Sequence, residues 1–538
     1  MSFFWTSFFG PPLLLVLGGL LLVASGRHLS ASRRGLGATW AAGAALVAWF
    51  LLRFFAANTE GYWLWSAPFG LDTTLAIQLS GWAWLAGLGI LLVLFCAVSL
   101  PGWQQEPGAV DGRAWALLLG CCGLLVVLAA SWVGLTLVWA LMMLGTGLIA
   151  GGFARDAARA WSAAILSTFL LLIASLLEGD TALTNVVGAV PLSALGQFLL
   201  IMAAMVPLGA YPFHTWLLSP SARAPGRHLT LHIVPALAAI HLLGRFDLPL
   251  LSAQAWPILA ISSLLGSALV AWAAHDTQRA WSYVLINRAS WVLLALAMIH
   301  GSTAKAAAML LLTLAAGSAL WAIARVVPRD RRWHLPLLGN MAVLYGLPLT
   351  PGFVASTALG RLVRPSLLLA GWLLVLLGQT LFVAALWRRS LLPPEEATDA
   401  AVGRPRALVL PMALAAGLAL WAGLFPASLY RLIGLETDAV GLFSLWREAG
   451  LTGWLTLLLP LAAGLALARS EEKLFAPWRG WQADMARLVG LDWLYGLLSR
   501  MLDGLALALG LLADLIDGAG QFGWVLLALL VALALFAS

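Results

Sequence analysis

Cysteine is nearly absent: Cys96, Cys121 and Cys122 are the three in 538 residues. All three lie within apolar runs and lack the spacing of metal ligands, so they are interpreted as packing residues. The sequence also lacks a glycine-rich phosphate loop and a haem-like histidine pair. It therefore predicts no metal site and no bound cofactor.

Charge is scarce as well. Charged residues make up 10% of the chain and hydrophobic residues 62%. No soluble core needs that much apolar surface, so the composition predicts an all-α polytopic membrane protein embedded in a lipid bilayer. The net charge of +7 is carried almost wholly by arginine, since Lys305 and Lys473 are the only lysines. The basic residues belong to one membrane face, so the charge is not interpreted as nucleic-acid binding.

Apolar runs long enough to cross a bilayer recur along the whole chain, and they predict about sixteen spans of ~20 residues. They fall at Pro12–Ala24, Thr39–Phe55, Leu79–Leu100, Ala114–Ala130, Trp132–Gly152, Ala157–Leu177, Leu192–Ala210, Leu229–Leu243, Pro257–Ala274, Trp281–Ile299, Ala306–Ala324, Leu335–Leu347 running on to Leu362, Leu367–Leu386, Ala407–Leu424, Leu451–Leu467 and Phe522–Ala537. The first run is interpreted as a retained span, because no small-residue cleavage site precedes a soluble domain.

Arginine clusters in alternate loops give the orientation. They are Arg27/Arg33/Arg34, Arg155/Arg159, Arg223/Arg227, Arg279, Arg325/Arg329/Arg331/Arg332 and Arg388/Arg389/Arg404/Arg406. The positive-inside rule places these loops in the cytoplasm of a cell (inner) membrane, and both termini outside. Arg361 and Arg364 fall on the opposite side and count against this orientation.

Two of the predicted spans are interrupted. Pro207 and Pro212 break the first, just before His214, and the glycine- and proline-rich stretch Gly346–Ser356 breaks the second. A broken helix survives in hydrocarbon only where protein or a wet cavity satisfies its freed carbonyls, so such sites are functional candidates. The alternative is a kinked helix whose histidines lie at a cytoplasmic loop, with Arg223, Arg227 and His228, and have no function.

The segment from Ser470 to Gly520 is too polar to span throughout. Polar residues from Asp492 to Asp517 recur at helical spacing opposite a Leu/Ala/Trp face. The pattern favours an amphipathic helix along the membrane surface or against neighbouring subunits. An ordinary cytoplasmic connector is the alternative.

Four stretches, in order along the chain, resemble those of one family. They are WSAPFGLDTTLAIQLSG (Trp65–Gly81), AYPFHTW (Ala210–Trp216) with His232 beyond it, DTQRAWSYVLINRASWVLLALA (Asp276–Ala297), and GLPLTPGF (Gly346–Phe353) with Ser356 beyond it. The chain resembles the antiporter-like membrane subunits of respiratory complex I, which are similar to the large subunits of multi-subunit sodium/proton antiporters.

The resemblance implies fourteen core helices arranged as two inverted five-helix repeats, with extra helices at the ends. The segments that it implies are 1–112, N-terminal helices; 113–250, the first repeat, broken near Pro207–Pro212; 251–390, the second repeat, broken near Pro348–Phe353; 391–469, C-terminal core helices; 470–520, the surface helix; and 521–538, a final span. It also implies proton movement through half-channels joined by a chain of charged residues.

The charged positions of that chain are replaced here. The family's glutamate on the fifth helix follows a tryptophan, but here Ala140 follows Trp139. The family's lysine on the broken seventh helix falls at Pro207, its lysine on the eleventh near Met309, and its lysine or glutamate on the twelfth at Ser356. Alanine cannot hold a proton, and proline cannot modulate a carboxylate. The usual proton channel is therefore expected to be degenerate or lost.

The ionisable residues that remain form a candidate proton path: His214, His232, His241, Arg288 and Lys305. Every Asp and Glu lies in or beside a loop or in the polar tail. A charged lysine in lipid costs on the order of 3 kcal/mol, so Lys305 needs a partner or a wet cavity. The alternative is that Lys305 snorkels near the loop at Gly301–Thr303, and that these residues have structural roles.

The predicted function is that of an antiporter-like membrane-arm subunit in a complex-I-like, redox-driven proton-translocating assembly, with a largely structural or coupling role. Its expected partners are other membrane subunits, and it is at most a non-catalytic subunit of a quinone-reducing translocase. A subunit of a sodium/proton antiporter, or of a bicarbonate-accumulating membrane complex, is the alternative. A polytopic membrane enzyme is disfavoured, because no acidic pair or metal cluster lies at a span end.

Overall fold

The computed structural model describes most of the chain. The described residues are 2–25, 28–55, 62–66, 74–103, 111–151, 157–178, 187, 191–218, 224–246, 248–253, 255–274, 276–298, 303–327, 334–357, 369–391, 405–435, 446–447, 449–475, 479–517, 525–526 and 529–530. They divide into two units, Met1–Arg479 and Gly480–Ser538. The predicted final span, Phe522–Ala537, lies mostly outside the described residues.

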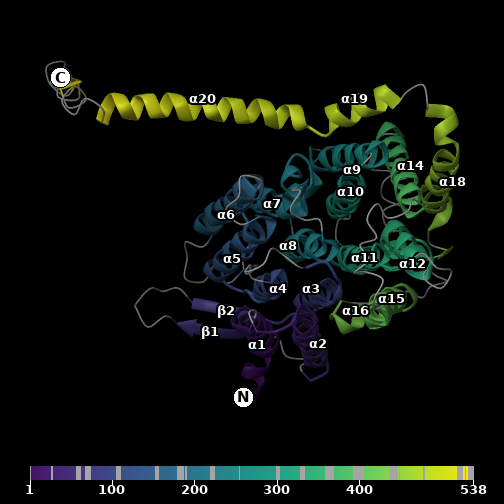
Figure 1. The fold of residues 1–538 in the computed structure, drawn as a ribbon, viewed down its shortest axis with the longest axis horizontal. Helices are drawn as coiled ribbons and strands as arrows, with labels where there is room; N and C mark the ends of the chain where they lie inside the picture. Colours follow the sequence, from purple (N-terminus) through teal and green to yellow (C-terminus); the bar gives the residue numbers. More distant parts are fainter. Residues whose placement is uncertain are drawn as a thin grey trace. The chain divides into compact units, whose positions relative to one another are not determined.

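The first unit is a helical bundle (Figure 1). Its helices are α1 (Ser2–Ser25), α2 (Ala31–Phe55), α3 (Gly81–Ser99), α4 (Gly112–Leu128), α5 (Trp132–Gly151), α6 (Ala158–Glu178), α7 (Ala194–Leu208), α8 (Pro225–Arg245), α9 (Ala255–Ala273), α10 (Thr277–Met298), α11 (Thr303–Ala324), α12 (His334–Tyr345), α14 (Leu369–Leu391), α15 (Val409–Leu424), α16 (Pro426–Leu432) and α18 (Gly450–Phe475). Short 3-10 turns lie at η2 (Thr215–Leu218), η4 (Pro249–Ser252) and η6 (Pro405–Leu408).

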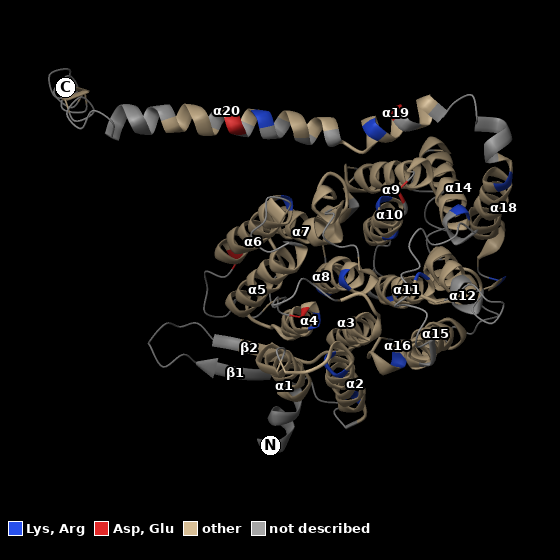
Figure 2. Ribbon diagram, in the orientation of Figure 1, with Lys and Arg blue, Asp and Glu red and all other residues tan. Residues whose placement is uncertain are grey.

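Helices α3, α10 and α11 form the centre of the bundle. The spanning windows of α10 and α11 are fully buried and that of α3 is 89% buried, whereas that of α18 is 28% buried. Helices that are apolar all round belong in such a core. The outer helices expose leucines such as Leu21, Leu166 and Leu458, which suits contact with lipid. Figure 2 shows how few charged residues the bundle carries.

Nine described helices, or ten if a bent pair is one span, are long and apolar enough to cross a membrane. Three shorter apolar helices accompany them. Every predicted run from Pro12–Ala24 to Leu451–Leu467 contains a helix. The chain is therefore a multi-pass helical membrane protein, as the composition predicted.

Both predicted helix breaks are confirmed. Helix α7 ends at Leu208, and its C-cap residue Gly209 adopts a left-handed backbone with φ of 64°. Helix α12 ends before Gly346, whose φ is 86°, and helix resumes at 351–357. A Cβ on Gly346 would approach the backbone carbon of Gly352 to 2.8 Å, so only glycine allows the two half-helices to come this close.

A β-hairpin was not foreseen in a fold predicted as all-α. Strand β1 (Tyr62–Ser66) pairs antiparallel with β2 (Thr74–Gln78), and Ser66 faces Thr74 in the register. The amide of Ala130, just after α4, donates to the carbonyl of Ala76 at 2.8 Å. The hairpin is thus continued by a segment more than fifty residues away, and such long-range pairing is not visible in local periodicity.

The second unit contains α20 (Asp492–Asp517), preceded by α19 (Arg479–Val489), which begins at the boundary between the units. At 1.5 Å per residue, α20 is about 39 Å long. Its exposed apolar side chains include Trp493, Leu497 and Met501. The amphipathic character agrees with the sequence pattern, and a position along the membrane surface stays a prediction.

The contact between α2 and α3 tests how tightly the bundle is packed. The indole of Trp49 donates to the carbonyl of Trp84 at 2.8 Å, and the indole of Trp84 donates back to the carbonyl of Trp49 at 3.1 Å. A Cβ on Gly87 would overlap the buried Trp49 ring. We expect Gly87→Ala to lower the free energy of unfolding by about 1–3 kcal/mol, because the indole cannot move without losing its hydrogen bond.

Thermal unfolding of the purified chain in nanodiscs measures this effect. Gly417→Ala is the matched control, because Gly417 lies inside α15 with no atom within 4 Å of the added Cβ. Equal melting temperatures for the two variants would contradict the packing described here.

Candidate functional site

The broken helix α7 leads directly into an aromatic and histidine cluster. His214, which follows the break, is fully buried, and its ring stacks on Tyr211 at 4.0 Å between centroids. Tyr283 of α10 lies 5.6 Å from the same imidazole. The indole of Trp216 donates back to the carbonyl of Val206 at 2.8 Å. The same carbonyl accepts the backbone amide of Gly209 at 3.0 Å, so the indole is a second donor to a carbonyl near the end of α7.

His232 lies in α8 and is 4% exposed. Its ring packs 3.9 Å from that of His228, one turn earlier on the same helix. Trp321 of α11 lies 5.3 Å from His228, and Trp216 lies 6.2 Å from His232. The two imidazoles thus form a pair enclosed by indoles.

His228 corrects the sequence interpretation, which placed it in a cytoplasmic loop. In the structure α8 already begins at Pro225, and His228 is fully buried within it. Proline is favoured in the first turn of a helix, and residues four apart share a face. A histidine pair on one helix face could therefore have been predicted from the spacing of Pro225, His228 and His232.

The other histidine of the predicted path, His241, does not join this pair. It follows His232 by nine positions, which is about two and a half turns and so the opposite face of α8. There its ring stacks 5.9 Å from Trp82, whose indole donates to the His241 carbonyl at 2.9 Å. His241 packs α8 against the start of α3.

Lys305 lies near one end of the bundle. It is the third residue of α11 and is half-buried. Trp321, which touches His228, is sixteen positions further along the same helix, about 24 Å at 1.5 Å per residue. Lys305 and the histidine pair therefore lie at different depths in the bundle.

Arg288 occupies the second break, at the end of α12. It projects from α10 and is 4% exposed. Its Nη1 donates to the carbonyl of Leu344 at 3.0 Å, and Nη2 donates to Gln379 Oε1 at 2.8 Å and to Asn287 Oδ1 at 2.5 Å. The guanidinium carbon lies 3.6 Å from the centroid of the Phe382 ring. Each of these acceptors is neutral, and the cation is further stabilised by the aromatic face.

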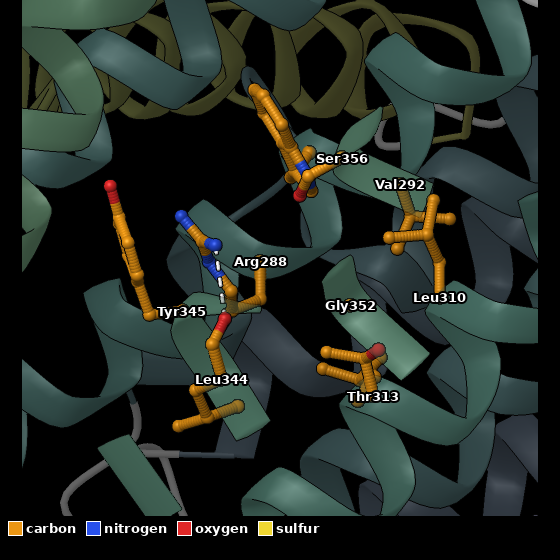
Figure 3. A pocket seen from close by; sticks show the side chains of 10 residues that line it. Arg288, Val292, Leu310, Thr313, Leu344, Tyr345, Gly352 and Ser356 are labelled. Carbon is orange, nitrogen blue, oxygen red and sulfur yellow. Dashed lines mark hydrogen bonds between the residues drawn. The ribbon is translucent and has the colours of Figure 1, made fainter. Parts of the chain in front are cut away.

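A small cavity lies beside this guanidinium (Figure 3), with room for roughly one water molecule. Its walls come from α10, α11, the end of α12 and the helix that follows the break. Ser356 and Thr313 contribute hydroxyl groups to this lining. Ser356 is one of the positions where the resemblance places a charged side chain.

The remaining replaced positions lie inside helices, and Ala140 of α5 is only half-buried. Pro207 and Met309 are buried within α7 and α11. Beside Ala140, the indole of Trp139 donates to Ser167 Oγ at 2.9 Å, and this hydroxyl donates to the Ala203 carbonyl at 2.8 Å. The polar groups of Trp139 and Ser167 thus pair with each other. Among the described residues, no group of three or more His, Cys, Asp or Glu is placed to hold a metal ion.

No family model and no curated protein matches this chain. Solved structures do. A chain of the Mrp complex from Dietzia sp. superposes with a TM-score of 0.80 at 19% identity, over 99% of this chain and 62% of that one. A chain of the membrane-bound sulfane sulfur reductase, an archaeal respiratory membrane complex, gives a TM-score of 0.74 at 16% identity, over 98% and 99%.

A chain of respiratory complex I from Thermus thermophilus gives a TM-score of 0.60 at 20% identity, over 78% of this chain and 97% of that one. At these identities the likeness establishes the fold. The chain has the polytopic fold of antiporter-like membrane subunits, as the resemblance predicted, and it spans about 62% of the length of the Mrp chain that it matches.

Arg288 provides a test of this geometry. We expect Arg288→Lys to lower the free energy of unfolding by about 1–3 kcal/mol, because an ammonium group has neither the planar fork for these acceptors nor the flat face that stacks on Phe382. Thermal unfolding measures the change. Arg431→Lys, at an exposed arginine of α16, is the control and should leave the melting temperature unchanged. If Arg288→Lys also left the melting temperature unchanged, these bonds would not hold the break together.

Proposed function

We propose that this chain is an antiporter-like membrane-arm subunit of a complex-I-like, redox-driven translocating assembly, and that it acts mainly as a scaffold and coupling element with a degenerate proton channel. It would sit in the cell (inner) membrane with both termini outside, against other membrane subunits. The single observation that carries the proposal is the occupancy of the channel positions: Ala140, Pro207, Met309 and Ser356 have no titratable side chain in the physiological range.

In the first half of the chain, the hydrogen bonds near Ala140 support a degenerate proton channel. A proton relay needs groups that exchange protons, and usually a carboxylate whose charge a nearby lysine modulates. Beside Ala140 the polar groups of Trp139 and Ser167 are instead paired with each other and with the carbonyl of Ala203. An indole and a serine hydroxyl do not titrate near neutral pH. This network fixes α5 against α6 and α7.

In the second half of the chain, the fixed charge of Arg288 supports a degenerate proton channel. The guanidinium of Arg288 remains protonated in proteins. Because the guanidinium does not release its proton, it cannot accept a proton from one neighbour and pass it to another, so it interrupts a relay at the break of α12. The residue that the sequence placed on a candidate proton path is therefore better suited to block such a path.

The histidine pair is the strongest argument for a surviving path. The two imidazole rings are in contact, with their centroids 3.9 Å apart, but a relay also needs carriers on both sides. His241 lies on the opposite face of α8, and Lys305 lies about 24 Å along α11 from the indole next to His228. We therefore assign the pair to packing between α8 and α11.

A subunit of an Mrp-type sodium/proton antiporter is the second candidate. It is favoured by the superposition on the Mrp complex, which covers 99% of this chain at a TM-score of 0.80. The partners distinguish the two. We expect affinity purification of the tagged chain from its native membranes to recover quinone-reducing redox subunits. Recovery of antiporter subunits without any redox subunit would favour the second candidate.

Proton translocation by the intact complex tests the degenerate channel. In proteoliposomes, we expect His228→Ala and His232→Ala to change the rate of proton translocation by less than about twofold, whereas removal of a group that transfers protons costs roughly 10²–10⁴-fold in rate. His28→Ala, at an exposed histidine outside the bundle core, is the control. If either variant of the pair abolished translocation in an assembled complex, the structural reading would be wrong.

A further inference from the structure

Arg288 is a buried cation for which the described residues offer no anion. In the described part of the chain the ion pairs are Arg34–Asp111, Arg113–Asp111 and Arg487–Asp484. The acceptors of Arg288 are two side-chain amides and one carbonyl. These groups and the Phe382 ring stabilise the guanidinium but do not cancel its charge. A charge buried at this depth is costly unless a counter-charge accompanies it.

The cavity beside this guanidinium has the size and lining to hold an anion that provides this counter-charge. It has room for roughly one water molecule, and among common anions the monatomic halides come nearest to that size. The hydroxyl of Ser356 lines it and makes no hydrogen bond to any described residue, so it is free to donate into the cavity. The hydroxyl of Thr313 donates to the carbonyl of Met309 at 2.7 Å and so offers the cavity no proton.

The remaining lining selects the type of anion. Val292, Leu310, Leu314 and Gly352 make most of these walls apolar. The rings of Trp291 and Tyr345 complete the lining, and the Tyr345 hydroxyl donates to the carbonyl of Leu457. Phosphate, sulfate and carboxylates have several oxygens that need donors, and they exceed a space for one water. A monatomic, weakly hydrated anion needs little more than one cation and one hydroxyl. The open second N–H of Arg288 Nη1 and the Ser356 hydroxyl supply these.

We propose that the cavity between Arg288 and Ser356 binds a single halide ion, chloride under cellular conditions. The ion neutralises Arg288 beside the break between α12 and the helix at 351–357, and so stabilises the two half-helices. This inference concerns the second break alone and does not depend on the proposed function of the chain.

Halide-dependent stability of the full-length chain in nanodiscs tests the proposal. Thermal unfolding is followed while sodium gluconate is replaced by sodium chloride or bromide at constant ionic strength. We expect a saturable rise in melting temperature with either halide, because a ligand that binds only the folded state stabilises it. Ser356→Ala should raise the chloride concentration at half-saturation roughly fivefold, through loss of one hydrogen bond.

Two further variants separate this site from general salt effects. Arg288→Gln removes the charge, and Ser356→Asp supplies a tethered carboxylate in place of the free ion. Both substitutions should abolish the halide response, and Ser356→Asp should keep a high melting temperature in gluconate, where no halide is present. Ser162→Asp adds the same charge at an exposed serine of α6 and should leave the response intact.

Bromide gives a direct observation, because its anomalous scattering locates it in crystals grown in sodium bromide. We expect one peak within hydrogen-bonding distance of Arg288 Nη1 and Ser356 Oγ, absent from crystals of Arg288→Gln. A halide-free cavity in the wild-type crystals would overturn the proposal, as would a halide response that persists unchanged in both Arg288→Gln and Ser356→Asp.

Discussion

Donation from arginine side chains to the carbonyl ends of other helices is the interaction on which this bundle depends. A helix leaves its last four carbonyls without partners, and hydrocarbon contains no water to satisfy them. Six helix ends here receive a guanidinium from elsewhere in the chain. The pairs are Arg113 to Val98 and Leu100, Arg245 to Ala129, Arg227 to Ile149, Arg388 to Trp272, Arg288 to Leu344 and Arg53 to Leu432.

This pattern gives the arginine bias a structural meaning. A guanidinium carries several N–H groups in a fixed fork, so one side chain can hold a helix end and a second acceptor together, and its positive charge suits the negative end of the helix dipole. Arg245, for example, also donates to Gln78 in the hairpin at 3.1 Å. These six arginines are thus committed to backbone carbonyls. That arrangement favours a rigid scaffold over a chain of exchangeable protons.

The positions of individual elements show where sequence reasoning succeeds. The two broken helices are predicted by Pro207, Gly346 and Gly352, because proline and glycine act locally on the backbone. His228 shows the opposite case, since the loop assigned around Pro225 is the first turn of α8. The hairpin was missed because Ala76 is paired with Ala130, far along the chain. His241 was grouped with His232, although helical phase alone separates them by half a turn.

The sequence by itself determined the membrane-embedded helical fold, the two breaks and the lack of acidic groups within the spans, since these follow from composition and local backbone chemistry. Only the tertiary structure decided which polar groups meet. Arg288 reaches Leu344 on one helix and Gln379 on another, 56 and 91 positions away. Helix packing, set by the shapes of many apolar side chains at once, creates such contacts, and no local pattern encodes them.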